Sequence, residues 1–517
     1  MRKAIYSSVK PILVSLLIVH AIGLNSLKAQ VKATSTTPNE RARQLNLAKA
    51  VEADMKNLDL HNQFIRSFSR KNQLLDSQYV VWAAKYPYIM EVPFAIGRYY
   101  ANLELPQARD WLFRTVKIDS LMTEAWVLLS YDAVRRGDRN LEQDYLLKAL
   151  NTGNATSKDF LNYAYYYKNK DQEKFHTLLS ELIHKFKGDP NSAWALSLIA
   201  KDTRDKQKKK VLYDSLYREY SGAMFSQAES ALYSYFLELL DEDPRAAHLL
   251  VRKILDDGRL KKWYWVDKER VARQFFTVDS LLLAGDVSQA SKVADSIDLM
   301  DPHKAEHIMA EESLLLLRAK VNKYNNLLKA AYDSLILYYS KKPSHKVFSA
   351  LLANAGDMNI SKDSLYKDIW KTRDSLSKPA TDFSLVNFLD GQKVSLSDLK
   401  GKVVLLTYWF PGCGPCRREF PFFEKAVGKY AEDVKYVGIN LINKQDDYVV
   451  SYMKSSGYTF IPLQNDPKWD KGTLYASGAP VNFLIDRQGR IIFSHFFIDE
   501  ENYNMFESMI AEMIERD

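Results

Sequence analysis

Apolar residues recur at helical spacing along the first two thirds of the chain. Amphipathic stretches cover residues 125–134, 141–150 and 160–167, and glycine-containing turns separate them. Proline and glycine interrupt helices and supply turns, and both are sparse in the long stretch from 45 to 378, which holds seven prolines and eight glycines. The pattern predicts that this region is almost entirely α-helical.

Large aromatic residues mark a repeat within the helical region. Trp126, Phe160 and Trp194 follow one another at equal intervals. A later unit at 281–297 has the same order of helix, Gly-Asp turn and helix with small residues. This pattern resembles the tetratricopeptide repeat, which has a period of about 34 residues and in which paired helices bury their apolar faces on the next pair. We expect four or five such units between about residues 88 and 305.

Two side-chain clusters in this region have more than one interpretation. The tyrosines between Tyr163 and Tyr167 are expected to pack between repeats, with a ligand-lining role as the alternative. The basic run Lys206–Lys210 is expected to be a solvated helix face or turn.

The pattern changes at Pro379. The segment 379–517 holds seven prolines and ten glycines in less than half the length of the helical stretch, and short β-branched runs replace the helical spacing. The run 403–409 is continuously apolar, as expected of a central strand. We expect strands at 382–385, 394–396, 403–409, 434–441, 481–486 and 490–494, and helices at 415–430, 446–455 and 501–516. This order predicts a mixed α/β sheet covered by helices.

The segment 1–29 has the features of a bacterial secretory signal peptide. Arg2 and Lys3 precede an apolar run from Pro11 to Leu24, and Ala29 offers a cleavage site. The run is short for a membrane span, but an uncleaved membrane anchor is the alternative. We therefore expect a bacterial protein that is exported, for example to the periplasm, and soluble after cleavage.

The net charge gives no reason to expect a nucleic-acid partner. The formal charge is +8, and Arg2, Lys3, Lys10 and Lys28 supply half of it, with no acidic residue before Glu40. A mature chain of this length with a charge of +4 lacks the strong positive excess that phosphate binding favours.

The chain has two cysteines, Cys413 and Cys416. A disulfide that links residues three apart closes a very small loop and contributes little stability. Cys413 follows the predicted central strand and opens the next helix, where unpaired N–H groups and the helix dipole lower the pKa of a thiol. The first thiolate of such a pair attacks a substrate disulfide, and the second resolves the mixed disulfide. Pro415 suits the first helical turn.

The motif Cys413-Gly414-Pro415-Cys416 after a strand resembles the thioredoxin redox motif. The segments 382–385, 399–405, 416–421, 478–481 and 483–486 together resemble the TlpA/ResA family of exported bacterial thiol–disulfide oxidoreductases. The resemblance implies a thioredoxin fold over residues 379–517. It also implies that Cys413 is the exposed nucleophile and Cys416 the resolving thiol.

The same resemblance assigns four further site residues. Glu419, one turn beyond Cys416, matches the family's active-site glutamate and is expected to exchange a proton with a thiol. Pro480 matches the superfamily's cis-proline, and the backbone of Ala479 is expected to pair with a substrate strand. Trp409 matches an aromatic residue before the motif. We expect Trp409, Ala479 and Pro480 to bind substrate.

Two positions depart from the family pattern. Pro411-Gly412 stands where an aromatic residue commonly precedes the first cysteine, which changes the surface offered to a partner. Thr407 occupies the place of thioredoxin's buried aspartate, which leaves Glu419 as the only matching acid.

Three alternatives remain beside this interpretation. A thioredoxin-fold peroxidase is one, although Leu406 and Phe410 stand where peroxiredoxins have proline and threonine. A zinc peptidase is another, suggested by His303 and His307 on one face of a predicted helix. The third is a repeat-based binding scaffold with ancillary redox activity.

We predict a multidomain chain with an N-terminal all-α, tetratricopeptide-like solenoid and a C-terminal α/β thioredoxin fold. The expected segments are a signal peptide at 1–29, the repeat domain at 30–360, a linker at 361–378 and the thioredoxin-like domain at 379–517. The expected activity is reduction or exchange of protein disulfides by Cys413 and Cys416, without metal or organic cofactor. The expected partners are disulfide-containing clients, positioned by the repeats, and an upstream electron-donating reductase, with a membrane-bound protein as one option.

Overall fold

The computed structural model describes residues 37–69, 73–222, 226–301 and 306–516. The predicted signal peptide, and with it the alternative of an uncleaved anchor, lies outside these ranges. Within them, no helix combines the length and apolarity that crossing a bilayer requires.

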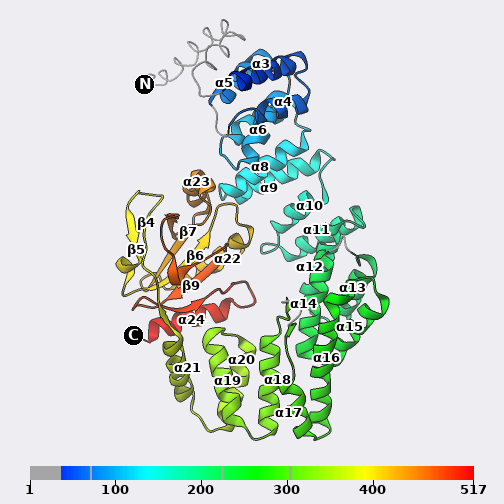
Figure 1. The fold of residues 1–517 in the computed structure, drawn as a ribbon, viewed down its shortest axis with the longest axis vertical. Helices are drawn as coiled ribbons and strands as arrows, with labels where there is room; N and C mark the ends of the chain where they lie inside the picture. The colour runs from blue at the N-terminus through cyan, green and yellow to red at the C-terminus, as the bar shows by residue number, and fades with distance from the viewer. Residues whose placement is uncertain (1–36, 70–72, 223–225, 302–305, 517) are drawn as a thin grey trace, which may run out of the picture. The chain divides into compact units, whose positions relative to one another are not determined.

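The chain forms two compact units. The first contains the residues up to Asp159 together with 444–456, and the second contains 160–443 together with 457–517 (Figure 1). The segment 444–456 comes from the C-terminal α/β region of the sequence, yet it belongs to the unit of N-terminal helices.

The first unit consists of consecutive helices whose contacts are strongest between neighbours in pairs, α6 with α7 and α8 with α9. Its helices are α3 (Pro38–Ala53), α4 (Leu58–Arg66), α5 (Gln73–Lys85), α6 (Glu91–Asn102), α7 (Ala108–Ile118), α8 (Thr123–Arg135), α9 (Arg139–Asn151) and α23 (Asp446–Ser456). Helix α23 docks on α8 through Tyr448, whose hydroxyl donates to Asp132 Oδ1 at 2.9 Å. Tyr452 packs against Gly137, where the backbone has a φ of +72°.

The second unit begins with a long run of helices. These are α10 (Ser157–Tyr165), α11 (Gln172–Lys185), α12 (Pro190–Asp202), α13 (Lys206–Glu219), α14 (Ser226–Glu242), α15 (Pro244–Asp257), α16 (Lys262–Leu283), α17 (Val287–Asp295), α18 (Glu311–Tyr324), α19 (Leu328–Lys341), α20 (His345–Asp357) and α21 (Lys362–Leu376). Aspartates cap several of them where the sequence shows a turn, for example Asp189 before α12 and Asp286 before α17. The predicted helical character of the N-terminal region is confirmed.

The three equally spaced aromatic residues lie in three alternate helices. Trp126 lies in α8, Phe160 in α10 and Trp194 in α12, so one helix separates each residue from the next. Trp194 Nε1 donates to Tyr165 Oη at 2.7 Å, which links α12 to α10 and supports the packing interpretation of the tyrosines. Lys206–Lys210 opens α13, and four of its five residues are exposed, as expected.

Two expectations differ from the structure. His307 lies in β2 (Glu306–His307), which pairs antiparallel with β1 (Met300–Asp301), and not on a helix. The helical face that the zinc-peptidase alternative requires is therefore absent at His307, while His303 lies outside the described residues. The stretch expected to be a linker, 361–378, contains α21, which contacts β10 (Arg490–Ser494) of the α/β region.

A six-stranded mixed sheet forms the C-terminal α/β region, with the order β3-β10-β9-β6-β7-β8. Its strands are β3 (Lys378–Pro379), β6 (Val403–Trp409), β7 (Val434–Asn440), β8 (Ile461–Gln464), β9 (Val481–Ile485) and β10 (Arg490–Ser494). All seven residues of β6 are buried, and β6 runs parallel to β7 and antiparallel to β9. Strands β3 and β8 were not predicted. The predicted hairpin is present as β4 (Ser384–Val386) and β5 (Lys393–Ser395).

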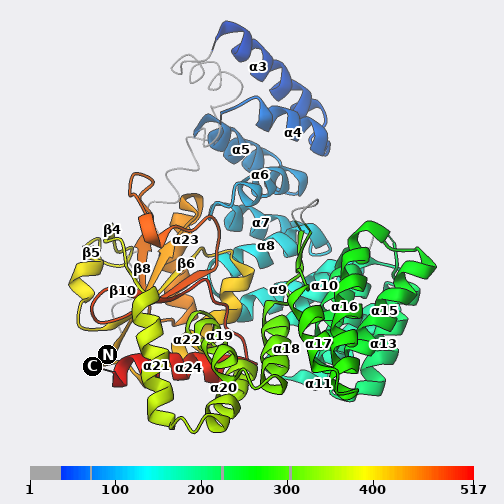
Figure 2. The ribbon, with the colours of Figure 1, turned by 60° about the horizontal axis from the view of Figure 1, so that its bottom comes forward.

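Two helices of this region pack side by side (Figure 2). They are α22 (Gly414–Lys429) and α24 (Tyr503–Glu515), and the rings of Phe423 and Phe506 lie 5.2 Å apart between them. Phe423 also contacts Tyr436 of β7, so α22 covers the sheet on the side that carries Tyr436. The result is the predicted thioredoxin-like α/β domain.

Candidate active site

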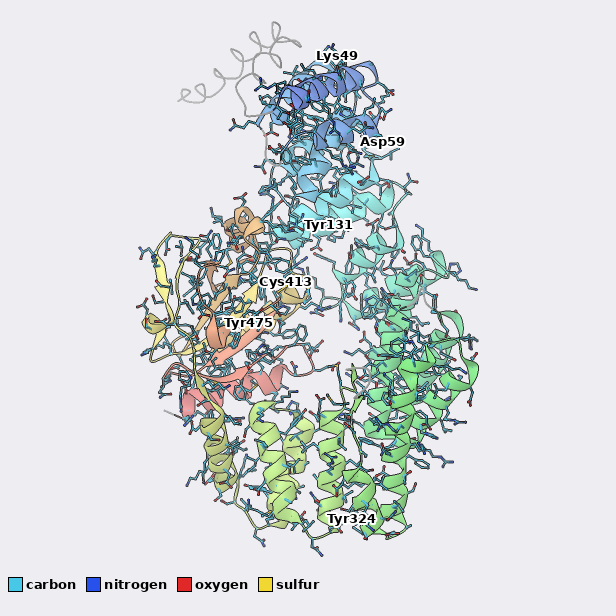
Figure 3. All side chains as sticks on the ribbon, viewed as in Figure 1. Lys49, Asp59, Tyr131, Tyr324, Cys413 and Tyr475 are labelled. Atoms are coloured by element: carbon cyan, nitrogen blue, oxygen red, sulfur yellow. A yellow bond between two sulfur atoms is a disulfide. The ribbon has the colours of Figure 1, made fainter. Side chains whose placement is uncertain are left out.

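The two cysteines lie where the central strand passes into α22, and Figure 3 labels the first of them, Cys413. Their sulfurs are bonded to each other. Cys413 is the N-cap of the helix, and its Sγ accepts the backbone N–H of Cys416 at 3.2 Å. Pro415 occupies the first turn, as predicted, where a missing N–H costs nothing. The Cα atoms of the pair are 5.4 Å apart. A thiolate at Cys413 would therefore accept the N–H of Cys416 and face the positive end of the helix dipole.

The prediction that Cys413 is exposed is wrong for this disulfide form. Its exposed fraction is 1%, and that of Cys416 is 0%. Cys413 Sγ turns inward to bond with Cys416 and to accept its N–H, so Gly414 and Pro415 form the exposed part of the motif.

Glu419 is completely buried one turn along α22 from Cys416. Its Oε1 accepts two hydrogen bonds, one from Asn482 Nδ2 at 2.9 Å and one from the backbone N–H of Ile498 at 2.8 Å. Its Oε2 has no hydrogen-bond partner among the residues that the structure describes. Burial raises the pKa of Glu419 to about 7, although both hydrogen bonds oppose that shift. A carboxyl with this pKa takes up and releases a proton near neutral pH.

Asn482 connects Glu419 to the central strand. Its Oδ1 accepts a hydrogen bond from Thr407 Oγ1 at 2.7 Å, and its Nδ2 donates also to the backbone carbonyl of Phe496 at 2.8 Å. Thr407, Asn482 and Glu419 all have an exposed fraction of 0%. Asn482 was not among the predicted site residues. The available signal was a polar residue inside an apolar strand, two positions after Pro480.

The predicted substrate-binding residues divide into two groups. The Ala479–Pro480 peptide bond is cis, as predicted, and both residues are partly exposed. Trp409 has an exposed fraction of 0% and packs against the rings of Phe420 and Phe460, whose centroids lie 5.7 and 4.9 Å from that of Trp409. Trp409 is therefore a core residue, and its prediction as a substrate contact is wrong, because the apolar β6 strand places its ring inside the domain.

No group of three or more histidine, cysteine, aspartate or glutamate side chains in the described ranges is arranged to hold a metal ion. The chemistry that these residues offer is that of two thiols and a neighbouring carboxyl.

Comparisons with known proteins agree with this chemistry. The family model described as Redoxin matches residues 376–507. The thioredoxin-like protein YneN of Bacillus subtilis is 36% identical over 114 residues, which are 22% of this chain and 66% of YneN. The thiol-disulfide oxidoreductase ResA of Bacillus thuringiensis is 34% identical over 125 residues, which are 24% of this chain and 70% of ResA.

A solved thiol:disulfide interchange protein of the thioredoxin family, from Chlorobium tepidum, is 26% identical. It matches 26% of this chain and 96% of its own, with a TM-score of 0.24. The two ResA and YneN alignments, together with the bonded cysteine pair at the start of α22, identify the activity of the C-terminal domain. The chain belongs to the ResA family of thiol–disulfide oxidoreductases.

Proposed function

We propose that this protein is an exported enzyme that reduces or exchanges disulfides in client proteins through a Cys413/Cys416 dithiol cycle. The observation that carries the proposal is the disulfide between these two residues at the N-terminus of α22. The pair has the spacing and the helix-start environment that nucleophilic thiol exchange requires.

The cycle begins with the reduced pair. The Cys413 thiolate attacks one sulfur of the client disulfide, the client S–S bond breaks, and the departing client thiolate takes up a proton. Cys416 then loses its proton and attacks Cys413 Sγ, which breaks the mixed disulfide and releases the second client thiolate for protonation. Two electrons pass from the dithiol to the client, and the enzyme is left with the Cys413–Cys416 disulfide.

Glu419 serves the second step of this cycle. Its carboxylate accepts the proton of the Cys416 thiol, and the resulting acid returns the proton to the departing client thiolate. The pKa of about 7 suits both directions of transfer near neutral pH. The partly exposed Ala479 and cis-Pro480 offer backbone to a client segment.

The remaining assignments follow from the amino-acid sequence. The segment 1–29 directs export to the periplasm or another compartment outside the cytoplasm, and an upstream dithiol reductase returns electrons to the oxidised pair. The N-terminal helices are tetratricopeptide-like repeats that position the client. The curated relatives are matched over about two thirds of their length.

Trapping tests the cycle directly. In the full mature chain, Cys416→Ser should accumulate a mixed disulfide with a client, because no resolving thiol remains. Cys413→Ser should accumulate none and should have no insulin-reducing activity. A Cys413→Ser variant that retains activity, or a Cys416→Ser variant with unchanged turnover, contradicts the proposed roles.

The reduction potential of the mature protein decides whether it reduces or oxidises its clients. A value near −270 mV, the thioredoxin end of the range, supports a reductase, and one near −120 mV, the strong-oxidant end, supports client oxidation. Equilibration with glutathione and dithiothreitol measures it, with Cys413→Ser as the control.

A further inference from the structure

The two oxygens of Glu419 have different surroundings. Both donors, Asn482 Nδ2 and the N–H of Ile498, converge on Oε1. Oε2 is buried and has no partner among the described residues. A protonated carboxyl places its proton on the oxygen that accepts fewer hydrogen bonds, since the oxygen that accepts two is the better carbonyl-like acceptor. The proton of the neutral acid therefore belongs on Oε2.

Asn482 can hold Glu419 in this way only in one orientation of its amide. Oxygen and nitrogen of an asparagine amide can exchange places by a half turn, and its hydrogen bonds decide between the two. The Phe496 carbonyl can only accept, so Nδ2 faces it and Glu419, and Oδ1 faces Thr407 of β6, whose hydroxyl donates to it. The second Nδ2 hydrogen goes to the Phe496 carbonyl. Both amide hydrogens and Oδ1 are therefore used.

We propose that Asn482, oriented by Thr407, is a positioning residue that anchors Glu419 through Oε1 and leaves Oε2 as the oxygen that exchanges the proton of Cys416. This inference rests on the proposed role of Glu419 as proton acceptor. It adds Thr407 of β6 and Asn482 of β9 to the site, and neither residue is among those that the sequence predicts.

The hydrogen bond from Asn482 also affects the pH at which the Glu419 carboxyl ionises. The Asn482 hydrogen bond favours the carboxylate, as does the N–H of Ile498, and both oppose the effect of burial. The charged groups that act on Glu419 are Arg418, its neighbour on α22, which favours the carboxylate, and Asp499, between β10 and α24, which favours the neutral acid. Removal of the Asn482 donor should raise the pKa of Glu419.

The variants Asn482→Ala, Thr407→Val and Thr407→Ser in the full chain test this inference. Two measurements apply to each: the pH dependence of single-turnover resolution of a mixed disulfide, and the infrared band of the Glu419 carboxylic acid. Glu419→Gln identifies both signals, since it removes the infrared band of the acid and the part of the pH dependence (the pH limb) that Glu419 causes. Asn502→Ala is the control for displacement of the 496–498 segment, because Asn502 Nδ2 donates to the Phe497 carbonyl and its Oδ1 accepts from the N–H of Asp499, both at 2.8 Å.

We expect Asn482→Ala to raise the pH midpoint of the infrared band, and that of the resolution rate, by ~1–2 units, the value of one charge-assisted hydrogen bond. Thr407→Val should raise both midpoints by less, because it removes only one of the three hydrogen bonds that hold the Asn482 side-chain amide. Thr407→Ser keeps the hydroxyl and should match the parent protein. Asn502→Ala should leave both midpoints in place.

The outcomes separate this inference from the proposed function. A limb that persists in Glu419→Gln refutes the role of Glu419 itself. Loss of the limb in Glu419→Gln, with unchanged midpoints in folded Asn482→Ala and in Thr407→Val, refutes only the positioning role. An equal movement in Asn502→Ala also refutes it, since a displaced 496–498 segment then explains the effect. If Asn482→Ala does not fold, the near-isosteric Thr407→Val decides.

Discussion

The substitution Glu419→Gln should change how the stability of the oxidised protein depends on pH. Glutamine has the shape of the protonated acid, and its Oε1 can still accept from Asn482 and from the N–H of Ile498. The substitution therefore keeps the packing of the neutral site and removes its ability to ionise. In the oxidised chain the cysteines carry no titrating thiol, so the comparison isolates the carboxyl.

The pKa of Glu419 determines the size and sign of the effect. Burial raises this pKa from 4.5 to about 7 in the folded protein. Between these pH values the folded state binds more protons than the unfolded chain, so stability falls as the pH rises. A difference of about 2.5 units at 1.36 kcal/mol per unit amounts to about 3 kcal/mol. The contribution is fully present below pH 4.5 and is lost as the pH rises through 7.

Hydrogen exchange of the β6 and β9 amides measures this effect in the full chain, because it reports the opening of the sheet itself. Glu419→Gln and the parent protein are compared at each pH between 5 and 8, which cancels the intrinsic pH dependence of exchange. The protection of the variant relative to the parent should rise by about 100-fold over this range. Glu424→Gln, also on α22, controls for the loss of one negative charge. A ratio that stays constant from pH 5 to 8 refutes the assigned pKa.

Three further predictions concern packing. Arg373→Met should lower the free energy of unfolding by about 3–5 kcal/mol, because it leaves Glu512 without the buried guanidinium that donates to it at 2.6 Å. The double variant Arg373→Met, Glu512→Leu should recover much of this loss, and urea unfolding measures both. Gly438→Ala should cost about 1–3 kcal/mol, measured in the same way, because its Cβ would lie 2.7 Å from the Phe460 ring. Tyr448→Phe should lower the free energy of unfolding by about 1 kcal/mol and raise the hydrogen-exchange rate of the α23 amides, because the hydrogen bond to Asp132 is lost. An unchanged exchange rate contradicts the docking of α23 on α8.

Local patterns were sufficient to predict most of the elements. The apolar run 403–409 is β6, the Asp390-Gly391 turn joins β4 and β5 with a φ of +75° at Gly391, and Pro415 lies in the first turn of α22. In each case residues close in sequence decide the conformation. Strand β8 escaped prediction because Pro462 lies inside a run of four residues, and a short edge strand is defined by its pairing with β7 and not by its own pattern.

The surroundings of the site residues could not be predicted in the same way. Glu419 was expected from its position after Cys416, but its anchor Asn482 is 63 residues away in the chain. The burial of Cys413 and of Trp409 depends on which face of the domain each side chain meets in the folded state. Such contacts arise when strands and helices distant in sequence pack together, and a single sequence carries no record of that pairing.

The contacts of α21 and α23 bear on how the catalytic region can be isolated. Arg373 of α21 is buried against the thioredoxin-like domain, with its guanidinium 4.9 Å from the ring of Phe493 and bonded to Glu512. A fragment that begins at 379 loses this arginine and leaves Glu512 unpaired, whereas one that begins at 361 keeps it. Neither keeps Asp132, the partner of Tyr448, and both expose the buried face of α23. Since exposed apolar helix faces promote association, we expect insulin-reducing activity from an isolated fragment that begins at 361 and carries a polar residue in place of Tyr452.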